Sequence, residues 1–178
     1  MERQMQIAKL PNNPENTELT RLVRTFRGWI DQAARGVHAS VEPLFLLRFD
    51  SATVDATCAS AVIRQGVRAG RVSDLVALLG YDKKEELGRT LNANNTSLWR
   101  WERDDKLLPV AIVEQLLRTM QLQLFATEVF GTVVAARKWL HASHPALEGM
   151  TPTEYANNEF GAQKVKGMLA GLKYGSVA

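Results

Sequence analysis

A group of hydrogen-bonding side chains near the middle of the chain is the part of the sequence best suited to recognise another molecule. Its members are Asn94, Asn95, Thr96, Ser97, Trp99 and Arg100. An asparagine amide can read adenine and an arginine guanidinium can read guanine, each through two parallel hydrogen bonds in the major groove of DNA. The group therefore predicts contacts with base edges. Short polar residues at the start of a helix also serve simply as caps, and this alternative stays open.

Two short helices, over 83–91 and 95–102, would have to position this group. The apolar positions that would hold them together are Leu87, Leu91, Leu98 and Trp101. Gly88 lies where the two helices would cross most closely, and a larger side chain there would push them apart. Asn92 lies in the connection, where a left-handed backbone is usually required and asparagine tolerates it. Asn94 can cap the second helix, which places the polar group on its exposed first turn.

The run KKEELGRTLNANNTSLWRWERDDKLLP, residues 83–109, resembles the Xre/Cro helix-turn-helix of phage repressors. The matching residues are Glu86, Leu87, Ser97, Leu98, Trp101, Glu102 and Pro109. The run departs from that pattern with Asn92 and Asp104, where glycine is usual or frequent. In such a module, residues at the start of the second helix reach base edges. Asp104 and Asp105 would then lie near a phosphate strand and weaken binding; otherwise the two carboxylates read as exposed, solvated neighbours.

A second stretch, from about Ala126 to the end, resembles the toxin-binding C-terminal domain of the Xre/MbcA/ParS antitoxins. The matching residues are Phe130, Gly131, Ala136, Trp139, Leu140, Pro145 to Leu147, Gly149, Thr151, Pro152, Gly161, Ala162, Val165, Leu169, Tyr174 and Gly175. The resemblance implies a non-enzymatic antitoxin without a cofactor, whose partner is a RES-type toxin related to ADP-ribosyltransferases and using NAD. It also implies that the last helix docks on the toxin and that the following tail occludes the NAD pocket. The residues assigned to toxin binding in this way are Lys173, Tyr174, Gly175, Ser176, Val177 and Ala178.

Local patterns in this second stretch predict its helices independently of the resemblance. Thr151 and Glu154 form a capping box around Pro152, so a short helix should begin there. A longer helix is expected over 159–173, with an apolar stripe on one side: Val165, Met168, Leu169 and Leu172. The glycines of that helix, Gly161, Gly167 and Gly171, predict that something packs closely against it. The small tail could enter a narrow pocket or simply fray into solvent, as most termini do.

The composition is close to that of an average soluble globular protein, and the succession of helical patterns predicts an all-α fold. The chain has 178 residues, of which 46% are hydrophobic and 23% charged, enough for one compact domain or two small ones. We expect a mostly helical extension over 1–70, with helices from Thr17 to about Gly36 and over 53–65, a helix-turn-helix domain over 71–130 and a toxin-binding domain over 131–178. Further helices are expected over 72–79, 109–130 and 132–142.

The single cysteine, the lack of a signal peptide and the lack of a long apolar run predict a cytoplasmic protein that does not contact a membrane.

Several other chemistries find little support. His141 and His144 could share a helical face, but Pro145 ends that helix and no further ligand cluster follows, so metal binding is not expected. Cys58 lies on an apolar face with no histidine nearby in sequence and reads as a structural thiol. The chain carries no phosphate-binding loop and no nucleophile elbow. Arg64, Arg68 and Arg71 form a basic cluster that is either a solvated linker or a phosphate contact.

The leading hypothesis is a type II antitoxin that inhibits its toxin and binds its own operator as a homodimer, because one recognition helix contacts too few bases. A stand-alone transcription regulator without a toxin is the alternative. A third possibility is a neutralising protein whose helix-turn-helix no longer binds DNA, since residues 71–130 carry eight Lys and Arg against nine Asp and Glu, a net charge of −1.

Overall fold

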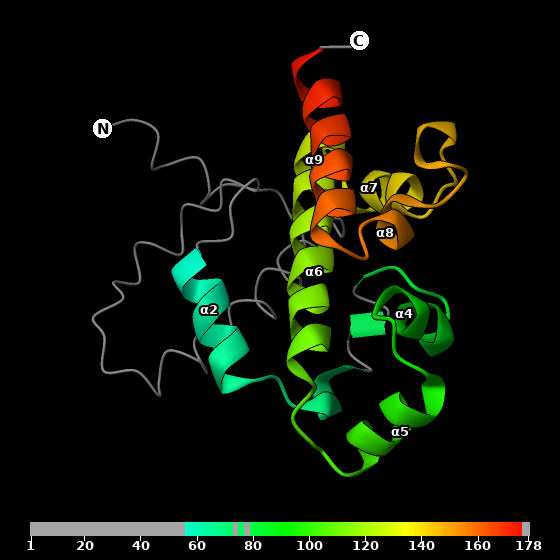
Figure 1. Ribbon diagram of the computed structural model, residues 1–178. Coiled ribbons are helices and arrows are strands. Elements are labelled where there is room, and N and C mark those ends of the chain that lie inside the picture. The colour runs from blue at the N-terminus through cyan, green and yellow to red at the C-terminus, as the bar shows by residue number, and fades with distance from the viewer. Residues whose placement is uncertain (1–55, 73–74, 77–78, 176–178) are drawn as a thin grey trace, which may run out of the picture.

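The computed structural model describes residues 56–72, 75–76 and 79–175 of the chain (Figure 1). Within these ranges every regular element is a helix, which confirms the predicted all-α fold, and the one β feature is an isolated bridge between Arg68 and Leu107. The helix predicted from Thr17 to Gly36 and the residues Ser176, Val177 and Ala178 lie outside the described residues, as does the side chain of Cys58.

The helices follow the predicted order closely. They are α2 (Ala56–Gln65), the short 3-10 helix η3 (Ala69–Arg71), α4 (Lys84–Thr90), α5 (Asn95–Arg103), α6 (Val110–Phe130), α7 (Val133–Leu140), the 3-10 helix η4 (Pro145–Leu147), α8 (Pro152–Tyr155) and α9 (Glu159–Tyr174). Val72, Leu75 and Val76 are also helical, in agreement with the helix predicted over 72–79. None of the described helices combines the length and the apolar character that crossing a bilayer requires.

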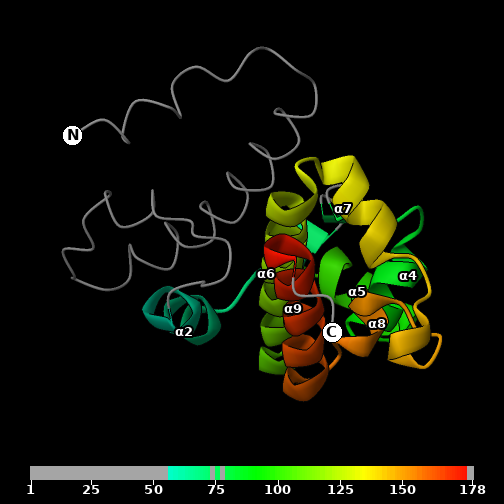
Figure 2. The same ribbon diagram turned by 90° about the horizontal axis from the view of Figure 1, so that it is seen from above.

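The long helix α6 stands at the centre of the described structure, with α9 beside it in both views (Figures 1 and 2). Pro109 precedes α6, and Gly131 ends it in the left-handed conformation, with φ of 77°. Such an αL residue is a common helix stop and favours glycine, which has no side chain to clash. Helices α2, α7 and α9 all pack against α6, so it positions both halves of the fold.

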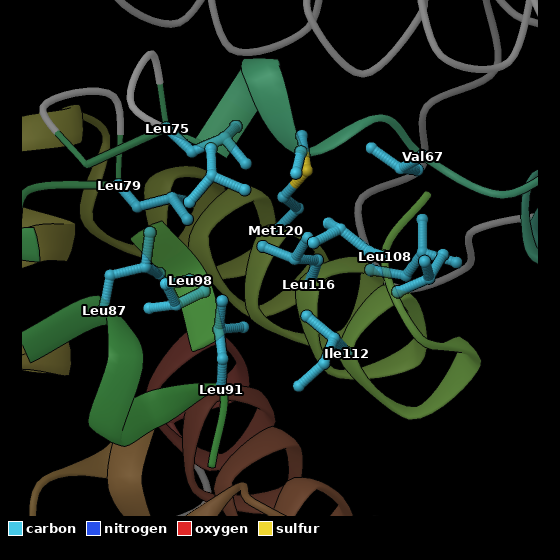
Figure 3. Close-up of a cluster of buried hydrophobic side chains, with 14 of the residues drawn as sticks. Val67, Leu75, Leu79, Leu87, Leu91, Leu98, Leu108, Ile112, Leu116 and Met120 are labelled. Atoms are coloured by element: carbon cyan, nitrogen blue, oxygen red, sulfur yellow. The ribbon is translucent and has the colours of Figure 1, made fainter. Parts of the chain in front are cut away.

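A first hydrophobic core joins the N-terminal half of α6 to α4 and α5 (Figure 3). Its fully buried side chains include Leu75, Leu79, Leu87, Leu91, Leu98, Leu116 and Met120. Val62 and Val67 are buried in it too, so residues close to the expected boundary at 70 are part of this core. Burying such side chains is the main stabilising contribution to the fold.

A second hydrophobic core lies between the C-terminal half of α6 and helices α7 to α9. Its buried members are Leu122, Phe125, Ala126, Ala136, Leu140, Leu147, Ala156, Ala162, Val165 and Leu169. Three of them belong to α6, before residue 131, so one helix contributes to both cores. The division of the chain into domains at 70 and 130 therefore stays a prediction.

Candidate functional site

The tight connection between α4 and α5 has the geometry that the sequence predicts. Asn92 adopts a left-handed backbone with φ of 53°. Gly88 is buried, and a Cβ atom added there would lie 3.0 Å from both the Ala93 carbonyl oxygen and Leu98 Cδ1. The expected roles of Asn92 and Gly88 are thus confirmed, and the two helices cross at a distance that larger residues would not permit.

The cap of α5 is also confirmed. The Oδ1 atom of Asn94 accepts a hydrogen bond from the backbone N–H of Ser97 at 2.7 Å. Because two parallel hydrogen bonds to adenine need both the oxygen and the amide of an asparagine, the capping role makes Asn94 a poor base reader. Asn95 is exposed and begins the helix, so it is the better candidate for that contact.

The outer face of α5 carries most of the remaining candidate residues. Thr96, Trp99 and Arg100 are exposed, whereas Ser97 is half-buried. The Arg103 guanidinium lies 4.8 Å from the centre of the Trp99 ring, which is 56% exposed. Arg103 is not among the residues that the sequence singled out, although its position four residues after Trp99 on a helix places the two side chains side by side.

The two aspartates after α5 are exposed, as the sequence suggests, but both also make polar contacts with the protein. Asp104 accepts a hydrogen bond from Arg103 Nε at 2.7 Å and pairs with Lys106 at 3.2 Å, and these cations hold the pKa of its carboxyl below the usual value. Asp105 adopts a φ of 42°, and its carboxylate accepts hydrogen bonds from the Gly70 N–H and from Arg68. The contacts of Asp105 tie the end of α5 to the segment around Arg68 and Gly70, whereas those of Asp104 stay within the turn after α5.

The side chains of the two histidines that follow α7 contact backbone carbonyl oxygens, and the two residues do not share a helical face. Helix α7 ends at Leu140, two residues earlier than predicted, so His141 and His144 lie beyond it. His141 Nε2 lies 3.2 Å from the Leu79 carbonyl oxygen, and His144 Nε2 lies 3.2 Å from that of Trp139. In the described part of the chain, no group of three histidine, cysteine or acidic residues is placed to hold a metal ion.

Helices α8 and α9 begin as the local patterns predict. The capping box of Thr151 and Glu154 is complete around Pro152. A Cβ atom at Gly161 would lie 1.9 Å from the Tyr155 carbonyl oxygen, so the close approach predicted there is confirmed.

Two predictions about the rest of α9 are wrong. A Cβ atom at Gly167 would meet nothing within 4 Å, because this residue lies on the side of the helix that faces away from the second core. Leu172 is 49% exposed and does not continue the buried stripe of Val165 and Leu169.

The last turn of α9 holds the described part of the expected toxin-binding tail. Lys173 Nζ lies 2.5 Å from Glu128 Oε1 on α6, and this contact raises the pKa of the lysine. Tyr174 is 75% exposed. Gly175 ends the helix in the left-handed conformation, with φ of 69°. The structure therefore ties Lys173 to its own chain and leaves Tyr174 accessible.

These features define an all-α protein in which one long helix connects a pair of short helices to a C-terminal helical module, whose last helix buries one side and exposes the other. Residues 125–175 match the family model of the antitoxin Xre/MbcA/ParS C-terminal toxin-binding domain. The match spans the end of α6 and all of α7, α8 and α9, and it supports an antitoxin role for this chain. No curated protein matches the chain.

Proposed function

We propose that this chain is the antitoxin of a type II toxin–antitoxin pair, acting in the cytoplasm on a RES-type toxin that uses NAD. The observation that carries the proposal is the match of residues 125–175 to a toxin-binding domain. The helices of the matched region pack around a core of their own, and α9 leaves one side exposed to a partner. In this role the chain inhibits by binding and needs no catalytic group or cofactor.

Inhibition in this proposal is steric. The residues from Lys173 to Ala178 would enter the NAD pocket of the toxin and compete with the dinucleotide. Two observations support this arrangement: Tyr174 is exposed, and Gly175 ends α9 in the left-handed conformation. A tail sealed into the second core would contradict it, and neither Tyr174 nor Gly175 is buried.

The chain would also repress its own operon through α4 and α5 as a homodimer. The outer face of α5 carries exposed residues that can contact DNA, namely Asn95, Thr96, Trp99 and Arg100. The left-handed turn at Asn92 and the close crossing at Gly88 support a helix-turn-helix, with α5 in the major groove. A palindromic operator is expected, because two copies are needed for useful specificity.

Removal of residues 174–178 tests the inhibitory tail. The truncated chain should no longer rescue cells that express the product of the adjacent gene, which is expected to be a RES-type protein and lethal alone. Its melting temperature and its gel shift on the upstream DNA should stay close to those of the full chain, because Tyr174 is outside both cores. Full neutralisation by the truncated chain would refute the tail mechanism.

Co-purification separates the proposal from its alternatives. A stand-alone regulator would bring down no partner when the adjacent gene is co-expressed. A neutralising protein without DNA binding would bring down the toxin but give no gel shift.

A further inference from the structure

The turn after α5 carries exposed side chains of both charges, and one carboxylate there holds two cations at once. Asp104 accepts a hydrogen bond from Arg103 Nε at 2.7 Å, and Lys106 Nζ lies 3.2 Å from its other carboxylate oxygen. All three side chains are exposed. Two positive charges against one negative charge leave the group with a net charge of +1. We refer to Arg103, Asp104 and Lys106 as the α5 charge cluster.

The stability of the fold does not explain this cluster. Ion pairs between exposed side chains contribute little to folding, because water screens the charges and ordering long side chains lowers their entropy. The contacts of the cluster stay within four consecutive residues, so they join no distant parts of the fold. Asp105 differs, since its carboxylate accepts hydrogen bonds from the Gly70 N–H and from Arg68, which are 35 and 37 positions away. A partner molecule therefore explains the α5 charge cluster better than folding does.

The cluster adjoins the residues of α5 that are proposed to contact bases. Arg103 follows Arg100 by three positions and Trp99 by four, so the three side chains lie on one side of the helix. Arg100 and Arg103 differ in their pairing. No described carboxylate pairs with Arg100, whereas Asp104 pairs with Arg103. The structure thus leaves the candidate base reader free and engages the cations beside it.

The length of α5 indicates which part of DNA the cluster would meet. A helix of nine residues is about 13 Å long, close to the major-groove width of about 12 Å. When the first turn of such a helix contacts base edges, its last turn reaches the edge of the groove, where the phosphates lie. Arg103 and Lys106 could bind a phosphate there. Asp104 already engages both cations with a carboxylate, which presents anionic oxygens as a phosphate does.

We propose that Asp104 is an internal substitute for DNA phosphate, which keeps Arg103 and Lys106 paired and so lowers the affinity of α5 for DNA of any sequence. This inference rests on the proposed DNA binding and adds a control of its strength. The sequence suggested repulsion by two carboxylates, whereas the contacts assign the effect to Asp104 and to the cations that it holds. Phosphate contacts carry no sequence information, so weakening them reduces non-specific binding and leaves base reading by Arg100 intact.

Asp104→Asn tests this inference, because it keeps the size of the side chain and removes the charge that holds the two cations. One additional neutralised phosphate steepens the dependence of log K on log salt by about 0.9, which is about eightfold between 1 M and 0.1 M salt. The variant should therefore bind the upstream DNA and a scrambled duplex about eightfold more tightly at 0.1 M salt, and this gain should vanish towards 1 M. Fluorescence anisotropy with the full chain and labelled duplexes measures both effects. A gain in affinity cannot be explained by misfolding.

Glu159→Gln is the matched control, because Glu159 is also an exposed carboxylate that pairs with an arginine, Arg118, at 3.7 Å. It lies on α9, which packs mainly against α6 and α8, so the same change in net charge occurs away from α5. Its affinity for DNA should equal that of the wild type. A second control adds Arg103→Ala and Lys106→Ala to Asp104→Asn, and the gain should then be lost. A gain that persists in this triple variant would contradict the inference.

The possible outcomes separate the inference from the function on which it rests. If the wild type binds the upstream DNA and Asp104→Asn binds it equally or more weakly at 0.1 M salt, the inference is wrong and DNA binding stands. An equal gain in Glu159→Gln would also overturn the inference, because net charge alone would then suffice. If neither the wild type nor Asp104→Asn binds any DNA, the inference and the DNA-binding role are both wrong, and co-purification still tests the antitoxin role. A wild type that does not bind and an Asp104→Asn variant that does would support the inference.

Discussion

Tyr81 is a buried tyrosine whose ionisation should make the stability of the fold depend on alkaline pH. Its hydroxyl donates a hydrogen bond to Thr90 Oγ1 at 2.9 Å, and its ring meets the edge of the His141 ring. Burial raises the pKa of Tyr81 to about 12. Since an unfolded tyrosine ionises near pH 10, the stabilisation is complete below pH 10 and is lost as pH rises towards 12.

The expected loss in the free energy of unfolding over that interval is about 2 to 3 kcal/mol from Tyr81 alone. Urea unfolding at pH 9 and at pH 11.5 measures it, with Tyr81→Phe as the control because this variant has no hydroxyl to ionise. The variant should lose less stability between the two pH values. An identical loss in both proteins would show that Tyr81 does not titrate in this way.

Arg100 is exposed on α5, and in the proposed DNA-binding role it is the candidate to read a guanine. Arg100→Ala should cost about 1 to 3 kcal/mol of binding at one base position and relax the preference there. Gel shifts on the operator and on operators with single base changes measure this effect. Arg103→Ala is the comparison, because Arg103 is engaged with Trp99 and Asp104 and should not change base preference. If Arg100→Ala weakens operator and scrambled DNA by the same factor, Arg100 contacts phosphate instead.

At the scale of the element, the stability of α5 depends on its first turn. Asn94→Ala removes the oxygen that accepts the Ser97 N–H and should lower the free energy of unfolding by about 1 kcal/mol. Asn94→Ser keeps a capping oxygen and should change stability by only a few tenths of a kcal/mol. Urea denaturation of both variants measures the difference. Equal destabilisation by Asn94→Ser and Asn94→Ala would show that the stability depends on the amide group of Asn94 and not on a capping oxygen.

At the scale of the whole molecule, the two cores should unfold together because α6 belongs to both of them. Leu116→Ala removes a fully buried side chain from the first core, and Leu169→Ala removes one from the second. Each should cost about 2 to 5 kcal/mol, since neither cavity can close completely. Differential scanning calorimetry should show one transition for the described helices in the wild type, shifted downwards in each variant. A variant with two separate peaks would show that the cores are independent.

The sequence by itself determined the features that depend on residues a few positions apart. The order of the described helices, the left-handed turn at Asn92, the cap at Asn94 and the capping box at Thr151 all follow from local sterics and local hydrogen bonds. Gly161 belongs with them, because the Tyr155 carbonyl that excludes a side chain there is only six positions away. Local patterns also predicted the apolar contacts between α4 and α5, which are close in sequence.

Only the tertiary structure decided which surfaces are covered. Asp105 meets Arg68 across 37 positions, and Gly167 and Leu172 lie on exposed sides of α9 although their spacing suggested packing. Periodicity shows that a helix has an apolar side, but the burial of each position depends on which neighbour the chain brings against it. The exposed side of α9, with Phe160 and Tyr174, is visible only once α6 is known to occupy the other side.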